Sequence, residues 1–322
     1  MKNRQTYEPY RSSLLPRTEL LKLYRLEPHH VVIDTLIAWT LIGAAMAAVV
    51  LKPTWWMVAL AVPLIGTRLY SLIIIAHDGL HRRLFDTVRA NDLWNDLFVL
   101  GSICTITRIN RTNHMRHHAE LALPTDPDRF KYSRVGRETP LGFLMTLTCI
   151  PLLVKAVGNV LLPQRPTGSG TASPTSASRK GYGLRDVAII GGWQIVLIGG
   201  LSWFIGWWAY PVLWIGPVAF ALCCDILRVF CEHSQLTDDG EADSTMRLVS
   251  YEANAIEKIL FAPNNMNHHI AHHLWPGIPY YNLPEAERLI RTNLQGNSKL
   301  TWRPSYFGHL RDFWESTLVA GR

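Results

Sequence analysis

Three groups of histidines suggest the chemistry of this chain. One group is a pair four residues apart, and in each of the other two groups three histidines stand at positions i, i+3 and i+4. The groups are His77 and His81; His114, His117 and His118; and His269, His272 and His273. On a helix, residues at these spacings share one face and can converge on one point. One metal ion takes at most about six ligands, and zinc sites take about four, so eight imidazoles indicate two metal ions.

The identity of the metal stays open at this level of reasoning. The His-Glu-x-x-His signature of zinc peptidases is absent, because Asp78 follows His77 and the next histidine of the pair is His81. A bundle-type di-iron centre depends on Glu and Glu-x-x-His ligands, and carboxylates are scarce around these histidines. An imidazole-rich set suits iron, copper, zinc or nickel.

The composition indicates a membrane protein with polar caps. Among 322 residues, 48% are hydrophobic and 18% are charged, and the charged share is below the ~25% of a typical soluble domain. The net charge of +7 comes without a basic helix or a base-stacking module, so we expect no nucleic-acid partner. We interpret the basic residues as determinants of orientation and as contacts to the membrane surface.

Four apolar segments are long enough to cross a bilayer. They cover residues 31–51, 55–76, 187–204 and 208–230, and about 20 residues at ~1.5 Å each span the ~30 Å hydrocarbon layer. Residues 1–30 are polar and carry six Lys and Arg residues, which predicts a cytoplasmic N-terminus. An even number of crossings then places the C-terminus and all three histidine groups on the cytoplasmic side.

Several segments are predicted not to cross. Residues 91–109 mix charges with aromatic and aliphatic side chains and favour an interfacial helix. Residues 140–162 are apolar, but a third crossing between His118 and His269 would separate the histidine groups, so this segment is expected in or on the cytoplasmic leaflet. Residues 163–178 form a Ser/Thr/Gly/Pro linker, and residues 285–293 predict an amphipathic helix.

The histidine groups stand in sequences that resemble the membrane fatty acid desaturase family, which includes hydroxylases and carotenoid oxygenases. The similar stretches are HDGLH, HMRHH and HHIAHH, followed by PGIPYYNLPE. The resemblance implies an all-α integral membrane protein with four transmembrane helices under a cytoplasmic helical cap that holds a histidine-rich di-iron site. It divides the chain into a cytoplasmic segment (1–30), a desaturase domain (31–287) and a cytoplasmic tail (288–322).

The resemblance also implies a ligand set and a co-substrate. Family members hold two iron ions with the histidines of the three boxes and one more after the fourth span, here His233, and they use O2. The family usually has Glu where this chain has Ala271, so carboxylates that orient imidazoles are expected elsewhere; the candidates are Asp126, Asp128 and Glu232. His268 stands where the family usually has an aromatic residue and is expected outside the ligand set. The remaining histidines, His29, His30 and His309, are expected at the surface.

The activity implied by the resemblance is introduction of a double bond into the alkyl chain of a lipid or acyl thioester. Hydroxylation or ketolation of a lipid or carotenoid at the same irons is the alternative. A metal transporter is a more distant alternative, and histidines gathered at one membrane face argue against it. The chain has no HPGG haem signature and no nucleotide fingerprint, so a separate electron donor of the ferredoxin or cytochrome b5 type is expected. The basic tail around Arg303, Arg311 and Arg322 is a candidate docking site.

Two charges inside the predicted spans suggest a buried ion pair. Arg68 lies nine residues before His77, and Asp225 lies eight residues before His233. At ~1.5 Å per residue both are ~12–14 Å from the metals and at similar depth. Charges at such depth are costly unless they are paired, so we hypothesise an Arg68–Asp225 bridge between the second and fourth spans.

Overall fold

The computed structural model describes residues 14–133, 137–148, 150–151, 154, 182–234, 247–294 and 300–320. The predicted linker 163–178, most of 148–162, residues 1–13 and Arg322 lie outside the described residues.

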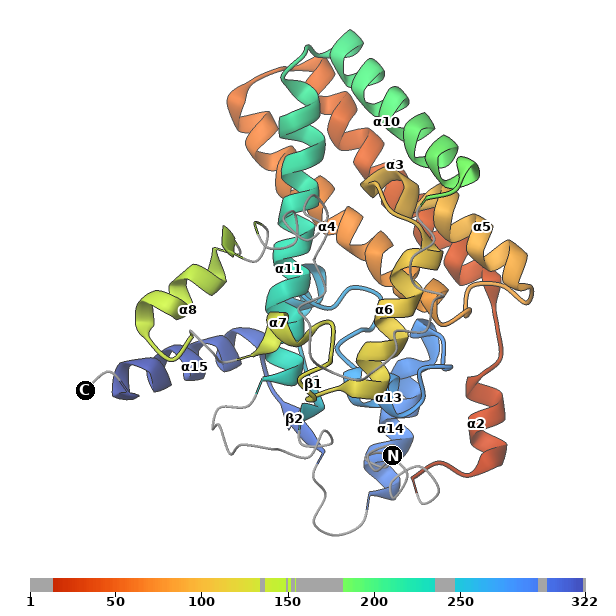
Figure 1. Cartoon of the computed structure of the whole chain (residues 1–322), viewed down its shortest axis with the longest axis vertical. Helices are drawn as coiled ribbons and strands as arrows, with labels where there is room; N and C mark the ends of the chain where they lie inside the picture. The colour runs from red at the N-terminus through yellow and green to blue at the C-terminus, as the bar shows by residue number, and fades with distance from the viewer. Residues whose placement is uncertain are drawn as a thin grey trace, which may run out of the picture.

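Four long apolar helices form one end of the molecule (Figure 1). They are α3 (Pro28–Leu51), α4 (Trp55–Leu80), α10 (Leu184–Phe204) and α11 (Gly216–His233). A π-helical turn, η3 (Pro211–Ile215), extends α11 to a continuous helix of 23 residues. All four are long and apolar enough to cross a membrane. The prediction of four long apolar helices in a mostly helical protein is confirmed, and these four candidate spans are consistent with a multi-pass membrane protein.

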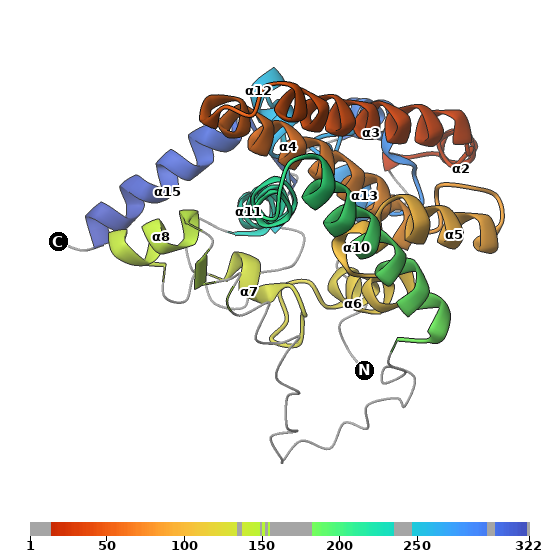
Figure 2. The ribbon, with the colours of Figure 1, turned by 90° about the horizontal axis from the view of Figure 1, so that it is seen from above.

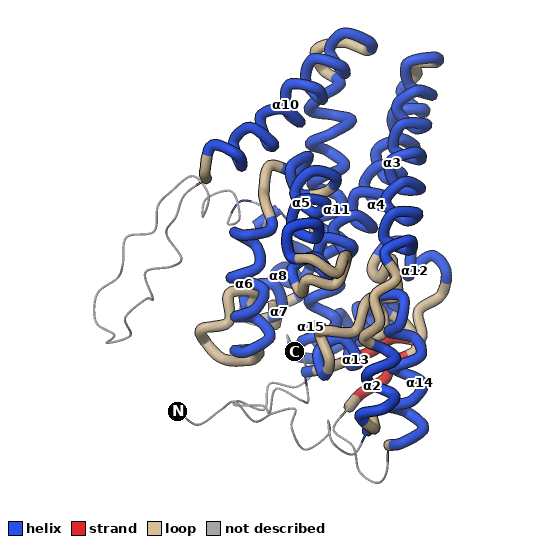
Figure 3. Tube along the Cα trace, turned by 90° about the vertical axis from the view of Figure 1, so that its right-hand side faces the viewer, coloured by secondary structure: helices blue, strands red, loops and turns tan. Residues whose placement is uncertain are grey.

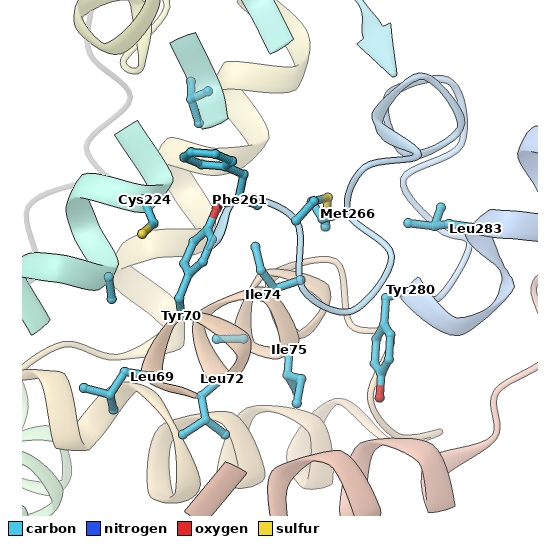
Figure 4. Close-up of a cluster of buried hydrophobic side chains, with 14 of the residues drawn as sticks. Leu69, Tyr70, Leu72, Ile74, Ile75, Cys224, Phe261, Met266, Tyr280 and Leu283 are labelled. Atoms are coloured by element: carbon cyan, nitrogen blue, oxygen red, sulfur yellow. Dashed lines mark hydrogen bonds between the residues drawn. The ribbon is translucent and has the colours of Figure 1, made fainter. Parts of the chain in front are cut away.

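Helix α4 packs between α3 and α11, and Figure 2 shows this arrangement from above, with α11 seen end-on. Close approach to α11 depends on Gly66, because a Cβ there would lie 2.6 Å from the Phe220 ring. Further along α4, the Tyr70 hydroxyl donates to the Phe261 carbonyl at 3.0 Å and joins the helix to the C-terminal half of the chain (Figure 4).

The other end of the molecule is a cap of shorter elements. Its helices are α2 (Arg17–Leu23), α6 (Thr107–Glu120), α7 (Arg129–Tyr132), α8 (Pro140–Leu147), α12 (Ala255–Leu260), α13 (His269–Leu274), η5 (Tyr280–Asn282), α14 (Leu283–Asn293) and α15 (Tyr306–Ala320). The eight residues of α8 are too few to cross a bilayer. The predicted amphipathic helix at 285–293 is observed as α14.

Helix α5 (Val88–Phe98) and the short η1 (Leu100–Ile103) occupy most of the segment expected at the interface. The polar residues Asn91, Asn95 and Asp96 of α5 are buried, whereas Leu93 and Phe98 are exposed. A helix that buries amides and exposes apolar side chains is suited to lie against lipid at the edge of the cap.

A two-stranded parallel sheet departs from the all-α expectation. Strand β1 (Val249–Tyr251) pairs with β2 (Thr301–Arg303) in the register Val249 to Thr301, and Figure 3 shows both strands beside α13 and α14. Each strand has only three residues, which is too short for alternation of polar and apolar residues to indicate a strand. The pairing holds the C-terminal segment against the cap, where Phe313 of α15 packs on Phe143 and Phe230.

The hypothesised Arg68–Asp225 bridge is wrong. Asp225 pairs instead with Lys131 at 3.0 Å and with Arg228 at 3.1 Å. The reason is helical phase: Gly66 faces α11, and two residues at about 100° each turn Arg68 to the opposite side of α4, toward α3. Equal depth in the membrane was therefore not sufficient for contact.

The tight contact at Gly66 generates a prediction with a matched control. Gly66→Ala should lower the melting temperature of the purified protein, because overpacking against Phe220 costs about 1–3 kcal/mol. Gly43→Ala, in α3, adds a methyl group that meets no atom within 4 Å, so it should leave the melting temperature unchanged or raise it. Equal effects of the two substitutions would contradict the role of Gly66.

Candidate metal centre

All nine histidines expected at the metals lie in one continuous cluster of the cap. In one group, a ligand nitrogen from each residue lies within 4.8 Å of the others; its members are His77, His81, His114, His118 and His272. A second group, by the same criterion, is His117, His233 and His273. The ninth histidine, His269, joins the second group through an Nε2–Nε2 distance of 3.0 Å to His233.

The ring nitrogens within the first group approach one another closely. The Nε2 atom of His114 lies 2.7 Å from that of His81 and 3.0 Å from that of His118. His272 Nε2 lies 3.1 Å from His118 Nε2. The groups adjoin, since the rings of His118 and His273 have centroids 4.3 Å apart. Each neutral imidazole has one acceptor nitrogen and one N–H, so this convergence of nitrogens on common points is the arrangement of metal ligands.

Four helix ends bring these side chains together. His77 lies in the last turn of α4 and His81 caps it, while His233 is the last residue of α11. The second box lies on α6 and the third on the six-residue α13. Because the first box and His233 end apolar helices, the cluster sits where those helices enter the cap.

Polar contacts that the sequence did not reveal fix the end of α4. Arg111 of α6 donates from Nε to the Leu80 carbonyl at 2.8 Å and from Nη2 to the Gly79 carbonyl at 3.0 Å, and it pairs with Asp92. Gly79 itself packs on the Asn95 amide, which a Cβ would approach to 2.5 Å. The first and second boxes are thus held together by a salt-bridged arginine that caps the helix carbonyls.

Burial keeps the imidazoles neutral. It lowers the pKa of His81 to about 3, with nearby Arg83 and Arg111 adding to the effect. Burial, followed by the charge of neighbouring histidines, also lowers the pKa values of His114, His118, His269, His272 and His273 well below the ordinary range. A neutral ring offers the lone pair that a metal requires.

Two histidines of the second group have partners that orient them. His117 Nδ1 lies 3.0 and 3.1 Å from the two oxygens of Asp126, a buried carboxylate that also accepts from Tyr132. His233 Nδ1 donates to the Arg247 carbonyl at 3.0 Å. A partner on Nδ1 leaves Nε2 free to bind a metal and fixes the angle of the ring.

The other two candidate carboxylates, Glu232 and Asp128, differ in their contacts with the histidines. Glu232 is fully buried, and its Oε2 lies 3.3 Å from His269 Nδ1 and 2.9 Å from Arg228, while Tyr306 donates to its other oxygen. The Asp128 carboxylate faces Lys131 at 3.5 Å and contacts no histidine within the described part of the chain. Asp126 and Glu232 therefore stand beside the cluster. The expectation for Asp128 is corrected: its half-buried carboxylate precedes α7, and its backbone N–H donates to Asp126 Oδ1 at 2.8 Å.

Asp78, which sequence reasoning did not assign to the site, connects the first and third boxes. Its Oδ2 accepts from the Tyr280 N–H at 2.7 Å, across 202 residues of chain, and its Oδ1 lies 3.8 Å from His77 Nδ1. The sequence feature that could have indicated this role is the position of Asp78 next to His77 in the first box.

Four histidines lie outside the cluster. His268 is not among the converging nitrogens. His29 and His30 are at the surface as expected, with 62% and 42% of their side chains exposed. The expectation of a surface position was wrong for His309, which is 2% exposed and lies 2.6 Å from the Tyr251 hydroxyl, because pairing of β1 with β2 carries α15 onto the cap.

Comparison with known proteins decides the family. The family model of fatty acid desaturases matches residues 53–305, more than three quarters of the chain. The chain belongs to the fatty acid desaturase family. One relative of this desaturase-family protein is the dihydrorhizobitoxine desaturase of Bradyrhizobium elkanii, 27% identical over 76% of this chain and 71% of the relative. Another is the sn-1 acyl-lipid omega-3 desaturase (ferredoxin) of Synechocystis sp., 22% identical over 83% of this chain and 75% of the relative.

The donor set fits the metal site of a desaturase. Every converging atom is a nitrogen of a buried or half-buried imidazole, and the orienting groups stand outside that set. Without a cation, pairs of neutral rings whose Nε2 atoms lie 2.7–3.1 Å apart could form at most one hydrogen bond each.

The same substitution at Asp126 and at Asp128, two residues apart, tests whether a carboxylate partner orients the His117 imidazole for metal binding. Asp126→Asn should weaken metal binding by about 10–100-fold, because His117 loses its charged partner. Asp128→Asn should leave metal binding unchanged. Metal retained by each purified variant after dialysis against a graded chelator measures the effect, and equal retention would contradict the role of Asp126.

Proposed function

We propose that this protein is a membrane-bound, O2-dependent di-iron desaturase that introduces a double bond into the alkyl chain of a lipid. The observation that carries the proposal is the pair of adjoining groups of buried imidazoles at the ends of apolar helices, in a chain of the fatty acid desaturase family.

The two groups suggest how the irons would be shared. The five-histidine group would hold one iron, and His117, His233 and His273 with His269 would hold the other. Bound iron would supply the oxidation chemistry, in which O2, two electrons and two protons convert two adjacent methylenes into a double bond and yield two water molecules. The protein keeps the imidazoles neutral, and Asp126 holds His117 in place, while Glu232 lies 3.3 Å from His269 Nδ1.

Desaturation is favoured over hydroxylation or ketolation because both relatives are named as desaturases. We prefer the alkyl chain of a lipid as the substrate for two reasons. The histidine cluster lies where the candidate spans enter the cap, and the sn-1 acyl-lipid enzyme is similar to this protein over 83% of this protein's length. Dihydrorhizobitoxine, named in the other relative, is the second substrate to test. Family membership removes the support for a metal transporter.

The electron donor is proposed to be a separate protein of the ferredoxin type, as in the name of the acyl-lipid relative; a cytochrome b5 type is the alternative. Arg311 is 70% exposed and could contact such a donor, although Asp312 and Glu315 partly balance its charge. Arg303 is largely covered and pairs with Asp312. The active site and both termini are proposed to face the cytoplasm, in agreement with the basic N-terminal segment.

Two histidines of the third box, four residues apart, allow a direct test of the metal assignment. The wild-type protein should contain about two iron ions per chain, as expected for two ligand groups. His272→Ala should remove most of the iron of the first group, whereas His268→Ala should retain the wild-type content because His268 lies outside both groups. Elemental analysis of the purified proteins gives the counts, and a wild-type content of one iron would refute the proposal.

The products formed in cells test the reaction. Expression of the wild-type chain in a host with saturated acyl lipids should yield lipids that are 2 mass units lighter per new double bond, because desaturation removes two hydrogens. His272→Ala should abolish these species. Mass spectrometry of lipids and of added dihydrorhizobitoxine identifies the substrate, and products heavier by one oxygen would establish hydroxylation instead.

A further inference from the structure

A polar pocket beside α4 is lined by His30 but by none of the nine histidines of the metal centre. It has a volume of about 440 Å³ and lies between α3, α4 and the segment that carries the third box. Its polar lining includes Asp34 of α3, Arg68 and Ser71 of α4, and Asn264, Asn265 and Tyr280. A single water takes about 30 Å³ in the liquid, so the pocket has room for a polyatomic group.

Arg68 has no partner in this pocket. Among the described residues, the guanidinium makes no ion pair or hydrogen bond, and its Nε is shielded from solvent. Arg68 also lies in the middle of a helix long enough to span the membrane. An ionisable group at such a position is costly without a partner and indicates a functional site.

A second unused donor lies in the same pocket. Ser71 donates to the Asn264 side-chain oxygen at 2.7 Å, which orients the amide so that Asn264 Nδ2 is its remaining polar atom. Within the described residues, this Nδ2 is buried without an acceptor. Arg68 and Asn264 together offer a cation and an amide N–H₂ to oxygen atoms that the protein does not supply.

The pocket continues into an apolar groove. Ile37 lines both the pocket and a groove of about 310 Å³ on α3, formed with Ile33, Leu36, Thr40 and Leu41. The four apolar side chains of the groove are 37–58% exposed. Since α3 is a candidate membrane helix, this face is suited to contact alkyl chains.

We infer that the pocket and groove bind an anionic lipid, with the carboxylate or phosphate oxygens on Arg68 and Asn264 and the alkyl chain along Ile33, Ile37 and Leu41. The bound lipid would join α3 and α4 to the 264–281 segment. Tyr280 of that segment is drawn in Figure 4, and its hydroxyl donates to Asp34 of α3. None of the nine histidines of the metal centre lines this site.

The test measures binding by the purified full-length protein with oleate, dioleoyl phosphatidate, neutral dioleoylglycerol and inorganic phosphate, by native mass spectrometry and thermal shift. Oleate or phosphatidate should bind and raise the melting temperature, and their relative affinities distinguish a carboxylate site from a phosphate site. Equal binding of dioleoylglycerol would overturn the role of the anionic group. Binding of inorganic phosphate as tight as that of phosphatidate would overturn the role of the alkyl chain.

Two substitutions in the pocket are expected to change anionic lipid binding in opposite directions. Arg68→Gln should weaken anionic lipid binding at least about tenfold, because a charge-assisted hydrogen bond is lost. Asp34→Asn removes a like charge but keeps an oxygen for Tyr280, so it should strengthen binding. Arg89→Gln, at an exposed position in the first turn of α5, removes the same charge as Arg68→Gln and should have no effect. Unchanged binding in Arg68→Gln, an equal loss in Arg89→Gln, or weaker binding in Asp34→Asn would overturn the inference.

Discussion

Convergence of imidazole nitrogens is the constraint on which the rest of the structure depends. Rings whose Nε2 atoms lie about 3 Å apart cannot all be satisfied by hydrogen bonds to one another. The arrangement is stable when a cation occupies the points of convergence, and the helices that carry the rings must then end at a common place. The ends of α4 and α11 and the whole of α6 and α13 are arranged around that requirement.

Helix α4 connects the cluster to the rest of the molecule. One face lies against α11 through Gly66, its end carries His77 and Asp78, and its opposite face turns Arg68 toward α3. The groups that position the site are therefore contributed by distant parts of the chain. Asp78 holds the segment after the third box, and Arg111 holds the end of the first box against the second.

A chain of buried charges performs a similar task on α11. Lys131 pairs with Asp225, Asp225 with Arg228, and Arg228 with Glu232, whose carboxylate lies beside His269. Such charges are tolerated inside a protein when each has a partner. This series of ion pairs connects α7, which follows the second box, to the third box along one face of α11, a candidate membrane helix.

The sequence by itself determined the local features: the four apolar lengths, the histidine spacings and the amphipathic helix 285–293, because each depends on residues within a few helical turns. Those spacings were sufficient to predict that the imidazoles of the three groups converge. Tertiary structure decided the partners. Asp225 pairs with Lys131 and Arg228 and not with Arg68, and the Asp128 carboxylate pairs with Lys131. His309 is buried, and Asp78 accepts a hydrogen bond from the segment after the third box. The physical reason is that composition fixes how deep a charge lies, whereas the rotation of each helix about its axis, set by packing contacts such as Gly66 on Phe220, fixes which neighbour it meets.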